Sequence, residues 1–182
     1  MDKFWLKSYP PGVPADIDYT RYRSLVHLLE EAFDKYAQRN AYVCMDRFIT
    51  YADVDLMSKK LGAWLQAQGL SKGARVALMM PNVLQYPVAM FGALRAGMVV
   101  VNTNPLYTPS EMKHQFNDSG ADVVVIVANF ASNLEKIRSD IQAKHVILTE
   151  LGDLLGGLKG SIVNLVVKHV KKMVPAYHLP GA

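Results

Sequence analysis

The side chains best placed to do chemistry in this sequence are polar residues in two short segments that follow predicted buried strands. These segments are Met80, Pro81 and Asn82, and Asn102, Thr103 and Asn104. In open α/β sheets, ligands bind beyond the carboxyl ends of the strands, so both segments are expected to line a substrate pocket. Asparagine and proline are also the ordinary residues of turns, so a purely structural role stays open as the favoured alternative. No catalytic residue follows from either segment.

Other motifs that carry chemistry are not found in the chain. The first predicted strand has no GxGxxG motif after it, and the sequence contains no GxSxG and no HExxH motif. The stretch 152–161 resembles a phosphate-binding loop, but Leu158 separates Gly157 from Lys159 and breaks the required register. The sequence therefore predicts no catalytic residue and no metal ligand.

Two isolated groups have an ordinary structural explanation. His114 and Asp118 lie four residues apart on one predicted helix, where a surface hydrogen bond is more common than an acid–base pair. Cys44 lies in a predicted strand with no basic neighbour to activate its thiol, and we expect it to behave as a small buried apolar residue. Neither group is assigned a catalytic role.

The elements that must position the polar segments alternate between strand and helix. After a helix capped by Ser24, a small hairpin and a second helix that ends near Gly69, the pattern has a βαβ rhythm. The expected strands are 75–80, 98–102, 122–128 and 145–150, and the expected helices are 82–95, 109–118 and 130–141. Strands such as VVVIV are apolar at consecutive positions, which is typical of a parallel sheet covered on both faces. The fold class is therefore α/β, a mostly parallel sheet with helices on both faces.

The chain divides into three predicted parts: an arm at 1–23, an α/β subdomain at 24–150 and a connector at 151–182. Three prolines disfavour regular structure in the arm, and its aromatic residues are suited to docking on a neighbouring surface. A second copy of the chain is one candidate for that surface, which would give a homodimer through the arm.

Composition and charge narrow the classes of function. The 182 residues are 51% hydrophobic and 20% charged, typical of a globular domain. The single cysteine cannot form an internal disulfide, and no apolar run reaches the length that spans a bilayer, so we expect a cytoplasmic protein. The net charge of +4 arises entirely from four lysines after Leu158, since no acid follows that residue. This placement does not indicate nucleic-acid binding, which usually needs a wider basic face.

The segment 161–174, SIVNLVVKHVKKMV, predicts an amphipathic helix. At 100° per residue its apolar side chains occupy one side, and Lys168, Lys171 and Lys172 lie on the opposite side. We expect these lysines to contact the inner face of the cytoplasmic membrane, because each is worth about 1 kcal/mol near an anionic leaflet. A helix that packs on the protein's own core is the alternative.

Several longer stretches resemble a known family. The stretches 49–56 (ITYADVDL), 75–97 (RVALMMPNVLQYPVAMFGALRAG) and 99–108 (VVVNTNPLYT) are similar to the opening third of bacterial long-chain fatty acyl-CoA ligases, members of the adenylate-forming superfamily. The resemblance implies the first of two related α/β subdomains. It also implies a two-step reaction in which a fatty acid and ATP, with Mg²⁺, give acyl-AMP and pyrophosphate, and coenzyme A then displaces AMP.

The resemblance also implies what this chain lacks. In that family the phosphate loop, the acidic metal and ribose ligands and the catalytic lysine lie beyond the part that this chain resembles. We therefore expect an inactive fragment that binds no cofactor tightly and whose partner is the remainder of the ligase chain. A noncatalytic α/β module that attaches to a membrane surface or a protein partner is the alternative.

Overall fold

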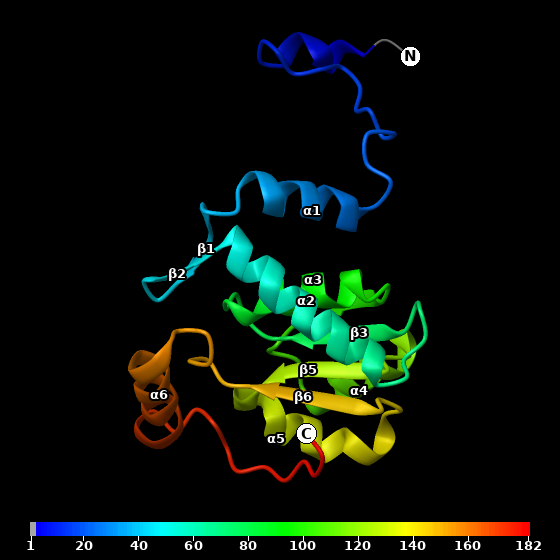
Figure 1. Ribbon diagram of the computed structural model, residues 1–182. Helices are drawn as coiled ribbons and strands as arrows, with labels where there is room; N and C mark the ends of the chain where they lie inside the picture. The colour runs from blue at the N-terminus through cyan, green and yellow to red at the C-terminus, as the bar shows by residue number, and fades with distance from the viewer. Residues whose placement is uncertain (1–2) are drawn as a thin grey trace.

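A four-stranded parallel sheet lies at the centre of the computed structural model, which describes residues 3–182 (Figure 1). Its strands run in the order β4, β3, β5, β6, and their bounds are Val99–Asn102, Arg75–Met79, Val123–Val127 and His145–Thr149. Every residue of β5 is buried, because helices cover both faces of the sheet. The predicted fold class is confirmed.

Alternate residues of the strands separate two layers of core. Val76 and Val125 face α2 (Tyr51–Ala67) and α3 (Gln85–Arg95), whereas Ala77 and Val124 face α4 (Pro109–Ser119) and α5 (Ala131–Ile137). This alternation follows from the two-residue period of a strand, which sends neighbouring side chains to opposite faces. The sheet is thereby fixed from both sides, and its strand ends are held in place.

A third cluster joins the N-terminal elements to the sheet layer. It packs α1 (Leu25–Lys35) and the hairpin of β1 (Asn40–Cys44) and β2 (Arg47–Thr50) against α2 and α3. Arg95 strengthens this junction, because its guanidinium pairs with Asp55 of α2 and, at 3.4 Å, with Glu30 of α1. The side chain of Arg95 is only 9% exposed and that of Asp55 23%, whereas that of Glu30 is 54% exposed, so the pair with Asp55 is the better shielded of the two.

Local capping signals set three of the helix starts. The Ser24 hydroxyl accepts a hydrogen bond from the His27 N–H, and the Thr50 and Thr108 hydroxyls each accept one from the third residue of their helices. At α2 the Asp53 carboxylate accepts a hydrogen bond in return from the Thr50 backbone N–H, and this bond lowers the pKa of Asp53. The Ser24 N-cap agrees with the sequence prediction.

Some predicted boundaries are wrong. α3 begins at Gln85 instead of Asn82, and Pro87 lies in its first turn, where the missing N–H would have no intrahelical partner. α5 ends at Ile137 and is followed by a 3₁₀ turn at Arg138–Asp140, so it stops short of Ile141.

The C-terminal helix differs most from the expected range 161–174. α6 spans Gly157–Leu165 and continues as a π-helical turn at Val166–Val170. It therefore begins four residues before Ser161, and it ends before Lys172, whose φ of 51° is incompatible with a right-handed helix. The early start brings Gly160 against Gly152, a backbone approach that any β-carbon would block.

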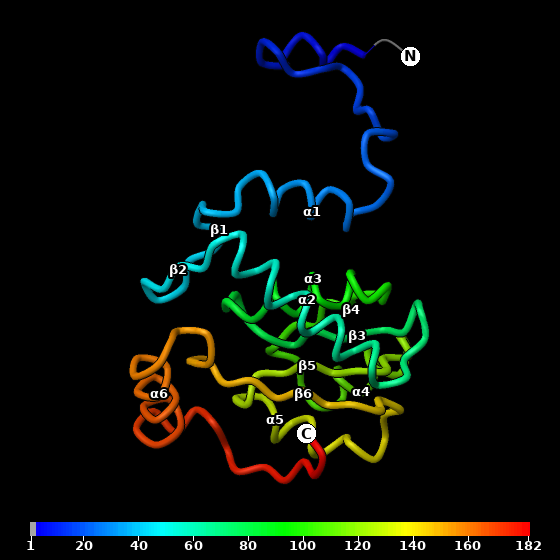
Figure 2. Tube along the Cα trace, in the orientation of Figure 1, coloured from blue at the N-terminus to red at the C-terminus, as the bar shows by residue number. Residues whose placement is uncertain are grey.

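The N-terminal arm extends away from the body (Figure 2). One 3₁₀ helix at Phe4–Ser8 interrupts it, which the sequence did not predict; this helix ends before the first proline of the arm. Phe4 and Tyr19 are 71% and 89% exposed, so neither is buried against the body of the chain. The arm does not join the sheet, and the docking expected of it stays a prediction, as do the three proposed parts of the chain.

Candidate functional site

The two polar segments predicted to line a pocket lie side by side, because β3 and β4 are neighbours in the sheet. The Thr103 N–H donates to the Leu78 carbonyl at 3.0 Å, and the Tyr86 hydroxyl donates to Asn102 Oδ1 at 2.6 Å. From the other side, Gln115 Nε2 donates to the Asn102 carbonyl at 3.1 Å. Asn102 is thus tied to both α3 and α4, and the two segments form one ledge at the carboxyl edge of the sheet.

The six residues predicted to line a pocket differ in their exposure, and therefore in whether a ligand can contact them. Met80 and Thr103 are buried, and their role is to pack the ledge. Asn104 Oδ1 accepts a hydrogen bond from the Leu106 N–H at 3.0 Å. This is the contact expected if Asn104 only stabilises a turn. Pro81, Asn82 and Asn102 are exposed. A binding role for this ledge therefore concerns Asn82 and Asn102 and stays a prediction.

A small hollow of about 230 Å³ adjoins the Asn82 end of the ledge. The hairpin contributes Tyr42 and Cys44 to its wall, and the start of α3 contributes Tyr86. Burial raises the pKa of Tyr42, so its hydroxyl stays protonated and available as a hydrogen-bond donor. Cys44 is half-buried here instead of lying in the core, because the hairpin is covered on one side only. The hollow offers hydrogen-bonding groups from the hairpin and from the start of α3.

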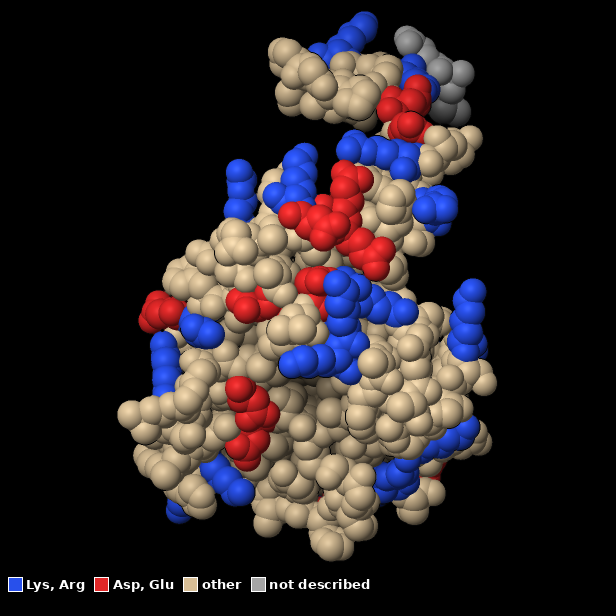
Figure 3. Space-filling model, viewed as in Figure 1, with Lys and Arg blue, Asp and Glu red and all other residues tan. Residues whose placement is uncertain are grey.

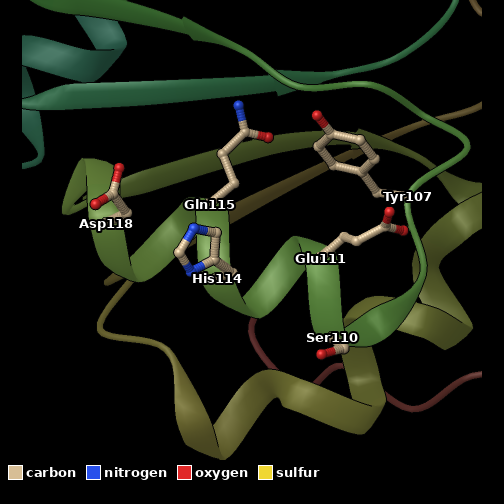
Figure 4. Close-up of a pocket in the computed structure, with 6 residues that line it drawn as sticks. All are labelled: Tyr107, Ser110, Glu111, His114, Gln115 and Asp118. Atoms are coloured by element: carbon tan, nitrogen blue, oxygen red, sulfur yellow. The ribbon is translucent and has the colours of Figure 1, made fainter.

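A second hollow, of about 420 Å³, lies beside the Asn102 end, along α4 (Figure 4). It is lined by Tyr107, Ser110, Glu111, His114, Gln115 and Asp118. His114 and Asp118 both face it, but no hydrogen bond joins their side chains, so the expected surface hydrogen bond is not formed. Glu111 is engaged by the Thr108 cap, which lowers its pKa. The hollow is polar but holds no coupled acid and base.

The strand order reveals a segment that sequence reasoning missed. The chain passes from β3 to β4 on one side and then back to β5 on the other, so the topological switch point lies between β3 and β5. Ala128–Phe130 follows β5 at that point, and Asn129 Nδ2 donates to the Met173 carbonyl at 3.0 Å. No local sequence signal marks Asn129, because its position depends on which strands are neighbours.

The described residues bring no set of candidate metal ligands together. Mg²⁺ is held by carboxylates together with phosphate oxygens, and residues 3–182 contain no cluster of three or more His, Cys, Asp or Glu side chains suited to a metal. The ledge presents amide groups and turn backbone. We therefore assign no step of a reaction to the side chains of this chain. Among the same residues, no helix combines the length and apolar content needed to cross a membrane.

The sequence profile, together with the parallel α/β fold, defines the class of protein. The chain belongs to the family of AMP-binding enzymes, whose sequence profile matches residues 29–174. That match includes the sheet, the helices on both faces and the ledge.

Curated relatives narrow the similarity further. The chain is 55% identical over 183 aligned residues to the long-chain-fatty-acid–CoA ligase of Salmonella typhimurium, an alignment that covers 100% of this chain and 33% of that protein. A ligase with the same name from Haemophilus influenzae is 48% identical, and one from Bacillus subtilis is 30% identical over 91% of this chain. The chain therefore spans about one third of the length of these relatives.

Solved structures agree with the sequence relatives. A fatty acyl CoA synthetase of Mycobacterium tuberculosis superposes with a TM-score of 0.64 at 28% identity, covering 68% of this chain and 26% of that one. An anthranilate CoA ligase in complex with anthranoyl-AMP superposes with a TM-score of 0.67 at 25% identity, covering 70% of this chain and 25% of that one. The family resemblance inferred from the sequence is confirmed.

Proposed function

We propose that this chain is the N-terminal portion of a long-chain fatty acid–CoA ligase, which converts a fatty acid, ATP and coenzyme A into acyl-CoA, AMP and pyrophosphate. The observation that carries the proposal is the 55% identity to such a ligase along the whole chain, combined with its coverage of only 33% of that relative. ATP, Mg²⁺ and coenzyme A are then cofactors and substrates of the intact enzyme.

Within that enzyme, we propose that this portion acts as a scaffold. Its sheet places Asn82 and Asn102 on one ledge, where amide groups can hydrogen-bond a polar substrate group, and the remainder of the ligase chain supplies the reacting groups. The alternative, a noncatalytic binding module, is not favoured by any contact at the ledge.

The test is an activity assay on the purified 182-residue chain. With oleate, ATP, Mg²⁺ and coenzyme A, we expect neither acyl-AMP nor acyl-CoA above the level of a heat-killed control. The Salmonella ligase assayed in parallel shows that the conditions support turnover. Turnover by the isolated chain would disprove the scaffold role, because this portion would then contain its own catalytic groups.

A further inference from the structure

An apolar groove of about 500 Å³ lies between helix α2 and the edge strand β6, on the sheet face that α2 and α3 cover. Val125 of β5 and Ile147 of β6 form its floor, and Leu61 of α2 and Val88 of α3 form its walls. α2 and α3 therefore leave this part of the sheet face accessible. A contiguous apolar surface of this kind marks an interaction site.

Contacts at both ends of β6 fix the shape of the groove. At the carboxyl end, Gln85 Nε2 of α3 donates to the Thr149 hydroxyl at 3.2 Å and to the Glu150 carbonyl at 2.7 Å. At the amino end, the rings of Trp64 in α2 and His145 in β6 meet edge to face, with their centroids 6.2 Å apart. Both helices are thus tied to β6, and the groove is formed before any occupant binds.

The charges beside the groove are not balanced. Lys60 of α2 lines the groove, is exposed and forms no ion pair within residues 3–182. Asp153, near the end of β6, already accepts hydrogen bonds from the Glu150 N–H and from Asn164. Figure 3 shows the hollow below basic side chains over α2 and beside acidic side chains near the end of β6. An occupant with a carboxylate beside Lys60 would complete an ion pair.

Strand β6 is the last in the sheet order, and its outer edge has no neighbour among the described strands. Proteins normally cover such an edge, because its unpaired N–H and C=O groups pair readily with other chains. The C-terminal tail of this chain runs on the opposite face of the sheet, where Leu179 packs with the core layer of α4 and α5. The chain spans only 33% of the Salmonella ligase, so a longer ligase has other segments that could cover the groove and the edge.

We propose that the groove between α2 and β6 is the docking site for an amphipathic helix of the remainder of the ligase chain, with a carboxylate of that helix beside Lys60. The helix continues the layer that α2 and α3 form on this face of the sheet. An acyl chain could fill the groove but would leave the edge of β6 uncovered, whereas a protein segment covers both. This inference rests on the proposed function, because only a longer ligase supplies such a helix.

The experiment measures how fast a cysteine in the groove reacts with N-ethylmaleimide. Val88→Cys and Leu61→Cys are made separately in the 182-residue chain and in a chimera in which this chain replaces the matching third of the Salmonella ligase. Mass spectrometry of the peptide that carries the new cysteine separates its labelling from that of Cys44. We expect the groove cysteines to react at least about tenfold more slowly in the chimera, because the docked helix blocks access to the thiol. Adding Lys60→Glu to the chimera should speed their labelling, since it removes the proposed ion pair.

A matched control separates groove protection from a general effect of the longer chain. Lys136→Cys is exposed on α5, on the opposite face of the sheet, and should react at nearly the same rate in both proteins. Equal rates at the groove cysteines in the two proteins would overturn the proposal, as would equal slowing at Lys136→Cys. Protection of the isolated chain by oleate or by a higher protein concentration would also overturn it, and would assign the groove to an acyl chain or to a second copy. Oleoyl-CoA formation by the same chimera is measured separately and tests the proposed function, so the two failures are distinguishable.

Discussion

The carboxylate of Glu111 shows how one side chain both starts a helix and makes its stability depend on pH. It accepts hydrogen bonds from the Thr108 N–H and hydroxyl at 2.8 and 2.7 Å, and the backbone bond is the main reason why its pKa lies below the ordinary value of 4.5. A carboxylate with a lowered pKa in the folded state stabilises the fold above its unfolded pKa, and this contribution is lost as the pH falls through the folded value.

We therefore predict that the Glu111→Gln variant loses less folding stability than the parent when the pH is lowered. The free energy of unfolding of the parent should fall between neutral pH and pH values below 4.5 by more than that of the variant. Urea unfolding followed by circular dichroism across this range measures the difference. The exposed Glu31→Gln serves as a control for a general charge effect, because Glu31 caps no helix. Identical pH dependence in the parent and Glu111→Gln would contradict the prediction.

Residues whose roles are local were predictable, and those whose roles depend on distant neighbours were not. Ser24 was identified as a cap because a cap and its partner lie within three residues of each other. The turn contact of Asn104 was anticipated for the same reason. Asn129 was missed because its importance depends on the strand order, and the burial of Thr103 depends on the packing of the loop against β3.

The position of α6 depends on two glycines that approach each other closely. A β-carbon on Gly160 would lie well inside van der Waals contact with the Gly152 carbonyl oxygen, and both partners are backbone atoms. We predict that Gly160→Ala lowers the free energy of unfolding by about 1–3 kcal/mol, because α6 must move away from the body.

The neighbouring substitution Ser161→Ala provides the control, since Ser161 is exposed on the same helix and its hydroxyl only contacts the Gly157 carbonyl at 3.3 Å. It should change stability by less than about 0.5 kcal/mol. Both variants are compared with the parent by urea unfolding. Equal stability of Gly160→Ala and the parent would mean that the close approach does not hold α6 in place.

Several apolar side chains of the N-terminal arm are largely exposed in this copy of the chain, among them Phe4, Ile17 and Tyr19. The contacts of the arm with the body include an Arg21–Glu31 pair at 3.8 Å and an edge contact between Tyr22 and His27. We predict that residues 4–19 dock on a neighbouring surface, such as a second copy, when the chain is concentrated. Hydrogen exchange at low and high protein concentration tests this: protection should rise with concentration, and fast exchange throughout the arm in both samples would refute it.

Elements with strong apolar periodicity or clear capping and turn residues were predicted well. Elements whose bounds depend on tertiary contacts were not. The four strands of the sheet were identified within one or two residues from their consecutive apolar positions. The start of α6 was misplaced because its first turn, Gly157–Gly160, has no apolar periodicity and is shaped by contact with Gly152. α5 ended early although its pattern continued to Ile141, which packs in the core from a non-helical segment.

The whole molecule is a layered sheet whose two outer strands, β4 and β6, each have one neighbour. The sequence predicted the parallel sheet and its two covered faces, but strand order requires knowledge of long-range pairing that no local pattern carries. The switch point between β3 and β5 followed only from that order. The family, in contrast, was recognisable from sequence motifs alone, and the matched residues 29–174 contain all of them.

The most direct test of the account replaces the matching third of the Salmonella ligase with this 182-residue chain and measures oleoyl-CoA formation. We predict that the chimera is active, because the chain supplies the same scaffold to the same catalytic remainder. A second chimera, carrying the matching part of the Haemophilus influenzae ligase, controls for damage caused by exchanging the segment. An inactive chimera with this chain beside an active Haemophilus chimera would contradict the claim that the chain is the N-terminal portion of such a ligase.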